Sequence, residues 1–255
     1  MNTKKDRKNL YMKVSNLDLI TRLRPLLEKS GYMLRPSDQK FVPRVAGSTW
    51  DAPWIYTKGE LTIRCDIYHR IMFNLLDHIH SACRDCWKIV VRPRTVIELL
   101  DLYELQKEMD VACKCGLEMR GTVCGLYGGY FYTRSKEQGL ERYEQVRKAV
   151  DENISPDIPV ILKRYCTEFE IGKGSKGPSD KVGPVTPEEL AFEKYVEAHF
   201  PSVGESTGQA EHVVANTIKR WIHHAFEHGD LTYLELTNGE KLIPDYVTYH
   251  HIKEN

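Results

Sequence analysis

Apolar residues recur every third or fourth position in several stretches of the chain, which is the spacing of an amphipathic helix. The clearest stretch is 66–82, where Ile67, Ile71, Leu75 and Ile79 occur every fourth residue. Similar patterns predict further helices over residues 16–30, 96–103, 140–150, from 187 onwards and over 209–228. Prolines and aromatic residues crowd the segment 32–62, where we expect loops and short strands.

A second pattern is made of short apolar runs rich in β-branched and aromatic residues. These runs predict four strands, at residues 87–93, 111–120, 128–134 and 160–166. Together with the helices between them they give the order β-α-β-β-α-β over about residues 87–170, which is the pattern of a ferredoxin-like sandwich. The sequence therefore predicts an α+β protein with a ferredoxin-like sandwich at its centre.

The remaining segments define the expected organisation. Residues 1–82 form an N-terminal helical and loop segment, 83–171 the sandwich, and 172–187 a glycine-rich linker. Residues 188–255 are expected to form two helices and a β-hairpin, because Thr237-Asn238-Gly239-Glu240 contains the Asn-Gly pair typical of hairpin turns. This arrangement permits a winged-helix-like module.

Charge and hydropathy limit the function classes. The chain has 36 basic and 36 acidic residues, so it offers no overall attraction to nucleic acid or to an anionic membrane. The N-terminus lacks the apolar run of a signal peptide, and no apolar stretch has the length of a membrane span. We therefore expect a cytoplasmic protein without a membrane partner, in which cysteines are reduced and available for metal binding.

The cysteines carry the strongest chemical signal. The chain contains seven of them: Cys65, Cys83, Cys86, Cys113, Cys115, Cys124 and Cys166. We take the first and third strands of the sandwich to be parallel, with the second and fourth opposed to them. The start of strand one, the turn after strand two and the end of strand four would then lie at one end of the sheet. This predicts that Cys83, Cys86, Cys124 and Cys166 ligate one centre.

Four thiolates suit a [4Fe–4S] cluster or a tetrahedral Zn²⁺ ion. The close Cys83 and Cys86 pair, followed by distant single cysteines, favours the cluster, since zinc sites usually take their ligands as two pairs. Additional ligands could come from Cys115, Cys113 or His80. Cys65 is interpreted as a small buried core residue.

Other residues suggest contact with nucleic acid or a nucleotide. Tyr130 and Tyr132 share one face of the third strand, where bases stack in RNA-binding domains of the same topology. Lys173 and Lys176 lie among glycines in the linker and could bind phosphate. The histidines of the 209–228 helix do not form the His-Glu-x-x-His motif of metalloproteases.

These patterns lead to one functional hypothesis and two alternatives. The hypothesis is an intracellular metal- or iron–sulfur-binding protein that binds or acts on nucleic acid. One alternative is an enzyme acting on a small molecule or nucleotide near the centre, with Glu168 and Lys163 as acid and base candidates. The other is a subunit that the metal merely stabilises.

Overall fold

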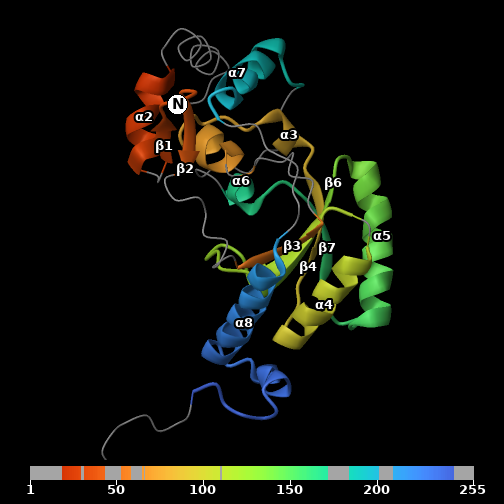
Figure 1. Cartoon of the computed structure of the whole chain (residues 1–255). Helices are drawn as coiled ribbons and strands as arrows, with labels where there is room; N and C mark the ends of the chain where they lie inside the picture. The colour runs from red at the N-terminus through yellow and green to blue at the C-terminus, as the bar shows by residue number, and fades with distance from the viewer. Residues whose placement is uncertain are drawn as a thin grey trace, which may run out of the picture.

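The computed structural model describes residues 19–29, 32–43, 53–58, 65, 67–109, 111–171, 184–200 and 209–243. Within these residues the protein has an α+β fold, as the sequence predicts, built around a five-stranded antiparallel sheet (Figure 1). A second group of helices and a two-stranded sheet lies at one end of this sheet (Figure 1). Each part has its own hydrophobic core.

The large sheet has the strand order β3-β5-β6-β4-β7, and every neighbouring pair is antiparallel. Its strands are β3 (Trp54–Lys58), β4 (Trp87–Val91), β5 (Cys113–Leu117), β6 (Tyr127–Thr133) and β7 (Val160–Arg164). Helix α4 (Val96–Glu108) joins β4 to β5, and α5 (Lys136–Asn153) joins β6 to β7. Residues 87–164 therefore follow the order strand, helix, strand, strand, helix, strand.

Side chains alternate between the two faces of the sheet along each strand, and helices α4 and α5 cover one of these faces. Ile89 and Val91 of β4 point into the core beneath α4 and α5, whereas Lys88 and Val90, which alternate with them, point to the opposite face. On the covered face β6 has a glycine where α4 comes close. A Cβ on Gly129 would lie 2.4 Å from Leu102 Cδ2, so a larger residue there would force the Leu102 side chain of α4 to move.

The second core lies beyond the sheet end at which β4 begins (Figure 1). Its apolar side chains include Leu27, Phe41, Ile71, Phe169 and Val196. They come from α2 (Leu19–Lys29), β1 (Tyr32–Arg35), β2 (Lys40–Pro43), a π-helix (η2, Ile67–Phe73), α3 (Ser81–Arg84), α6 (Thr167–Ile171) and α7 (Pro187–Glu197). Helix α7 therefore packs with the N-terminal elements, although more than a hundred residues separate them.

The C-terminal helix α8 (Glu211–Glu227) packs on the large sheet instead. Trp221 is fully buried in the sheet core, and its indole Nε1 donates a hydrogen bond to the carbonyl of Pro53 at 3.0 Å. After α8, the carboxylate of Asp230 accepts hydrogen bonds from the backbone N–H of Val96 at 2.6 Å and from the hydroxyl of Tyr127 at 2.7 Å. These bonds fasten the end of α8 to α4 and β6.

Two local predictions are wrong. The stretch 66–82 does not form one regular helix: the π-helix η2 ends at Phe73, and Asp77 adopts a positive φ of 55° that no helix continues through. The predicted C-terminal hairpin is also wrong in its first strand, because Leu231–Leu236 forms a 3-10 helix (η4) whose start is capped by Asp230. Most of the predicted second strand lies outside the described residues.

The glycine-rich segment 172–187 lies mostly outside the described residues. Helix α7 begins at Pro187, and Thr186 and Glu189 form a capping box around its first turn. Among the described helices, none combines the length and apolar character needed to span a bilayer.

Candidate metal centre at one end of the sheet

Strand register brings Cys86 and Cys166 together. Trp87, the first residue of β4, pairs with Arg164, the last residue of β7. Cys86 directly precedes the first of these residues, and Cys166 follows shortly after the second. The backbone N–H of Tyr165 also donates a hydrogen bond to the carbonyl of Cys86 at 3.0 Å. The sheet thus places both thiols at the same end.

The same register excludes Cys124 from this end, which corrects the sequence prediction. Strand β4 is antiparallel to β6, with Trp87 opposite Thr133 and Val91 opposite Gly129. Because β5 is antiparallel to β6, it is β4 and β5 that run parallel, and the turn after β5 lies at the far end of the sheet. An exposed Cys124 in this turn is separated from Cys86 by the length of a strand, about 13 Å or more.

Lys88 is the charged group next to the paired thiols. Its side chain is 4% exposed, and Nζ donates a hydrogen bond to Cys166 Sγ at 2.9 Å. Burial by itself would lower the pKa of Lys88, but the charges of Cys166 and Cys86 outweigh burial and raise it. Lys88 therefore keeps a positive charge in a site that excludes most water.

The two thiols differ in their protonation. The pKa of Cys166 lies well below its usual range because Cys86 and His69 hydrogen-bond to it and Lys88 lies beside it. The pKa of Cys86 is raised, first by the hydrogen bond to Cys166 and then by burial. One thiolate, at Cys166, is thus stabilised by donors from a strand, a π-helix and a neighbouring cysteine.

Two more cysteines approach this pair. Cys83 is buried on α3, and its pKa is raised by burial and then by the nearby charges of Cys65 and Cys166. The charge of Cys65 also contributes to the raised pKa of Cys86. These interactions connect four thiols: Cys83 with Cys65 and Cys166, and Cys86 with the same two cysteines.

The sequence does not identify Cys65 as a site residue. It predicts a buried core residue, whereas Cys65 is exposed and close to the thiol site. The available signal was its spacing to His69, because residues four apart on a helix share one face. Both residues precede the Cys83 and Cys86 pair, so a His and three thiols were within about twenty residues of one another in the sequence.

The additional ligands proposed from the sequence have other surroundings. Cys113 and Cys115 belong to the core beneath α4, on the sheet face opposite Lys88. His80 accepts a hydrogen bond from Ala82 N–H through Nδ1 at 3.0 Å, and its Nε2 lies 3.4 Å from Glu193 and 3.3 Å from Glu197. These three residues contribute to packing and to a carboxylate network rather than to the thiol site.

The predicted acid and base candidates are held in ion pairs. Glu168 Oε1 lies 3.1 Å from Arg120 Nη1, and Lys163 pairs with Glu170. The other carboxylate oxygen of Glu168 is buried without a hydrogen-bond partner. Acid–base catalysis by these residues stays a prediction.

The sheet face that bears Lys88 also carries aromatic and cationic residues. The hydroxyl of Tyr130 donates to Glu118 at 2.7 Å, and Trp54 packs edge-on against the Tyr130 ring. Lys114 Nζ lies 4.5 Å from the Trp54 ring centroid and 5.4 Å from that of Tyr56. Tyr132 is on this face too, whereas Lys173 and Lys176 lie outside the described residues.

Among the described residues, no three cysteine sulfurs lie within 4.8 Å of one another. One group of three potential metal ligands does meet that limit, and it is on α8: His224, Glu227 and His228.

Comparisons of the chain with models of known protein families, with curated proteins and with solved structures found no match.

Proposed function

We propose that this protein is an iron–sulfur protein in which Cys65, Cys83, Cys86 and Cys166 hold a [4Fe–4S] cluster at the end of a ferredoxin-like sandwich. In this proposal β4 to β7 with α4 and α5 form the sandwich, and β3 is an additional edge strand. The observation that carries the proposal is the convergence of four thiols from separate elements around the buried Lys88 ammonium group.

The spacing of the thiols favours a cluster over a single zinc ion. Zinc–thiolate bonds of about 2.3 Å in a tetrahedron keep ligand sulfurs within roughly 4 Å of one another. The described cysteines contain no such group of three, whereas a four-iron cluster separates its ligands more widely. Zn²⁺ is the competing occupant, and metal analysis distinguishes the two.

Lys88 has a defined part in this proposal. Four thiolates around a cluster carry net negative charge, and a buried ammonium group next to Cys166 offsets part of it. Hydrogen bonds to ligand sulfurs and nearby charge are among the factors that set the reduction potential of a cluster. Lys88 would therefore tune the potential as well as stabilise the bound state.

Anaerobic purification of the full chain tests the cluster. We expect a brown protein that absorbs near 400 nm and contains about four iron and four sulfide ions per chain. Cys86→Ser and Cys166→Ser should lose this absorbance, while Cys124→Ser, the matched control at the other sheet end, should keep it. A colourless protein with stoichiometric zinc, or loss of iron in Cys124→Ser alone, would overturn the proposal.

A second proposal concerns the face of the sheet opposite α4 and α5, which we propose binds single-stranded nucleic acid. Tyr56 is 44% exposed beside Lys114, and an aromatic ring next to a cation is the arrangement on which bases stack and phosphates bind. Burial lowers the pKa of Lys114 to about 8, so its positive charge is present below that pH and is lost above it.

Fluorescence anisotropy with labelled single-stranded DNA and RNA tests the second proposal. Tyr56→Ala should weaken binding about tenfold, because stacking of one base on an aromatic ring contributes about that much to the affinity. Leu231→Ala, an exposed apolar residue on η4, is the control and should bind normally. Affinity should also fall between pH 7 and 9 as Lys114 loses its proton. Equal binding by wild type and Tyr56→Ala would rule out this face.

A further inference from the structure

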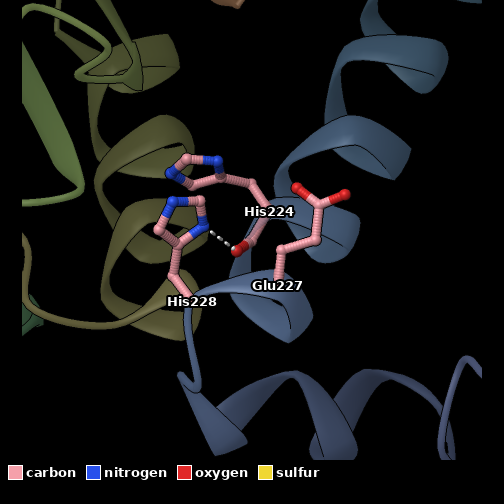
Figure 2. A group of neighbouring side chains, drawn as sticks. All are labelled: His224, Glu227 and His228. Carbon is pink, nitrogen blue, oxygen red and sulfur yellow. Dashed lines mark hydrogen bonds between the residues drawn. The ribbon is translucent and has the colours of Figure 1, made fainter.

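The last turn of α8 gathers a second group of metal-binding side chains, far in sequence from the cysteines. His224, Glu227 and His228 each offer one ligand atom, and these atoms all lie within 4.8 Å of one another. Figure 2 shows the two imidazole rings one above the other on one side of the helix, with the Glu227 carboxylate on the adjacent side, away from the outer nitrogens of the rings. The ring centroids of His224 and His228 are 3.9 Å apart.

The hydrogen bond of His228 fixes which of its nitrogens is available. Nδ1 lies 2.9 Å from the carbonyl oxygen of His224, which can only accept, so Nδ1 carries the proton (Figure 2). The lone pair of neutral His228 is therefore on Nε2. Histidines that bind metals commonly donate their other ring N–H to a carbonyl in this way, because the bond orients the ring.

His224 supplies a second, independent observation. Its Nε2 atom is buried and has no hydrogen-bond partner. The ring packs edge-on against Tyr127, 6.2 Å between centroids, which limits its rotation away from His228. A buried ring nitrogen without a partner is unusual in a folded protein, and a bound cation would satisfy it.

Charge at this end of α8 also favours a cation. The unpaired carbonyl groups of a helix C-terminus give it a partial negative charge, and Glu227 adds a carboxylate. Two imidazoles and one carboxylate suit Zn²⁺, whereas Mg²⁺ and Ca²⁺ prefer oxygen ligands throughout. Zinc sites with three protein ligands keep a water molecule at the fourth position.

We propose that His224, Glu227 and His228 form a Zn²⁺ site with an open fourth position, separate from the cysteine site. Bonds of about 2.0–2.2 Å would place the ligand atoms closer together than they now lie, so binding must draw them inward. Glu227 and His228 are exposed, and their side chains can rotate to do so. The half-buried His224 would serve as the fixed member of the site.

Histidine-ring NMR signals of the full chain, followed during addition of Zn²⁺, test this site directly. The signals of His224 and His228 should shift and saturate together, and the signal of His223 should not move. His223 is exposed on the same helix turn and is absent from the ligand group, so His223→Gln is the matched control.

We expect His228→Gln and Glu227→Gln to weaken Zn²⁺ binding at α8 at least about tenfold, and His223→Gln to leave it unchanged. Because the signals report the α8 histidines themselves, the outcome does not depend on what the cysteines bind. Unmoved His224 and His228 signals, or wild-type affinity in His228→Gln, would overturn the proposal. Using Glu227→Gln as well guards against a variant that fails to fold.

Discussion

Lys88 shows how one residue can couple folding to chemistry. A lysine is rarely buried unless it has a charged or hydrogen-bonding partner, because removing its charge from water is costly. Lys88 has such partners in Cys166 and Cys86. Its neighbour across the sheet, Lys163, belongs to the same face but pairs with Glu170. Comparing substitutions of the two lysines therefore separates the effect of the contact with Cys166 from the effect of a positive charge on this face.

Lys88→Met tests the role of that contact. Methionine fills a similar volume but removes the donor to Cys166, so the reduction potential of the proposed cluster should become more negative, on the order of 50 mV. Lys163→Met is the control and should leave the potential close to the wild-type value. Potentiometric titration of the purified proteins measures both. An unchanged potential in Lys88→Met would show that the contact does not influence the cluster.

At the scale of elements, α7 is joined to the residues before β4 by a buried carboxylate. Glu193 on α7 is 2% exposed and accepts hydrogen bonds from His78 at 2.7 Å and from the backbone N–H of Ser81 at 2.7 Å. Its other oxygen also accepts from the Ser81 hydroxyl and lies 3.4 Å from His80. This network fixes the segment that leads into Cys83 and Cys86.

Glu193→Gln should therefore reduce the free energy of unfolding by about 3 kcal/mol, because it leaves buried donors without their charged acceptor. Glu188→Gln, on the exposed side of the same helix, should change it by less than about 0.5 kcal/mol. Chemical denaturation of the three proteins at neutral pH measures the difference. Equal destabilisation by both variants would contradict a specific role for Glu193.

The same network predicts a loss of stability in acid. Burial lowers the pKa of His80, so protonation favours the unfolded state as pH falls below about 6.5. Burial opposes ionisation of Glu193, but hydrogen bonds from His78 and Ser81 outweigh it and lower its pKa, so its contribution is lost as pH falls below about 4.5. Melting temperatures from pH 7 to 4 should decline, and the decline below pH 4.5 should be smaller in Glu193→Gln.

At the scale of the whole molecule, the cysteines lie where the two hydrophobic cores meet. Cys83 belongs to the core of α2, α7 and η2, and Cys166 packs against that core, while Cys86 directly precedes β4 of the sheet. Polar contacts also join the two parts here: Arg164 Nε donates a hydrogen bond to the carbonyl of Arg84 at 2.9 Å, and Lys163 of β7 pairs with Glu170 of α6. A bound cluster would thus hold the two cores together.

Removal of the cluster should loosen the second core more than the sheet. Binding free energy at a metal site that bridges distant segments becomes folding free energy, on the order of 10 kcal/mol for structural zinc. We expect amides of α2 and α7 to exchange with solvent at least about tenfold faster after cluster removal, with smaller changes in α4 and α5. Hydrogen exchange followed by mass spectrometry measures this, and uniform acceleration throughout the chain would contradict it.

Much of the fold could be predicted because its elements have strong local signals. The β-branched run of β4, the helical apolar faces of α4 and α5, and the capped start of α7 each identify an element without tertiary information. Local signals were insufficient where a segment departs from regular geometry. The π-helix η2 and the 3-10 helix η4 were predicted as an α-helix and a strand, since apolar spacing alone does not distinguish these conformations.

The sequence by itself determined the α+β class, the positions of strands β4 to β7 and the placement of Cys83 and Cys86 before β4 and of Cys166 after β7. Only the tertiary structure decided which thiols meet. Strand direction sets the end of the sheet at which each connection lies, and the antiparallel pairing of β4 with β6 moves Cys124 away from Cys86. Cys65 lies near Cys86 instead, close enough for its charge to contribute to the raised pKa of Cys86. Neither relation has a local signal, because each depends on contacts between residues far apart in the chain.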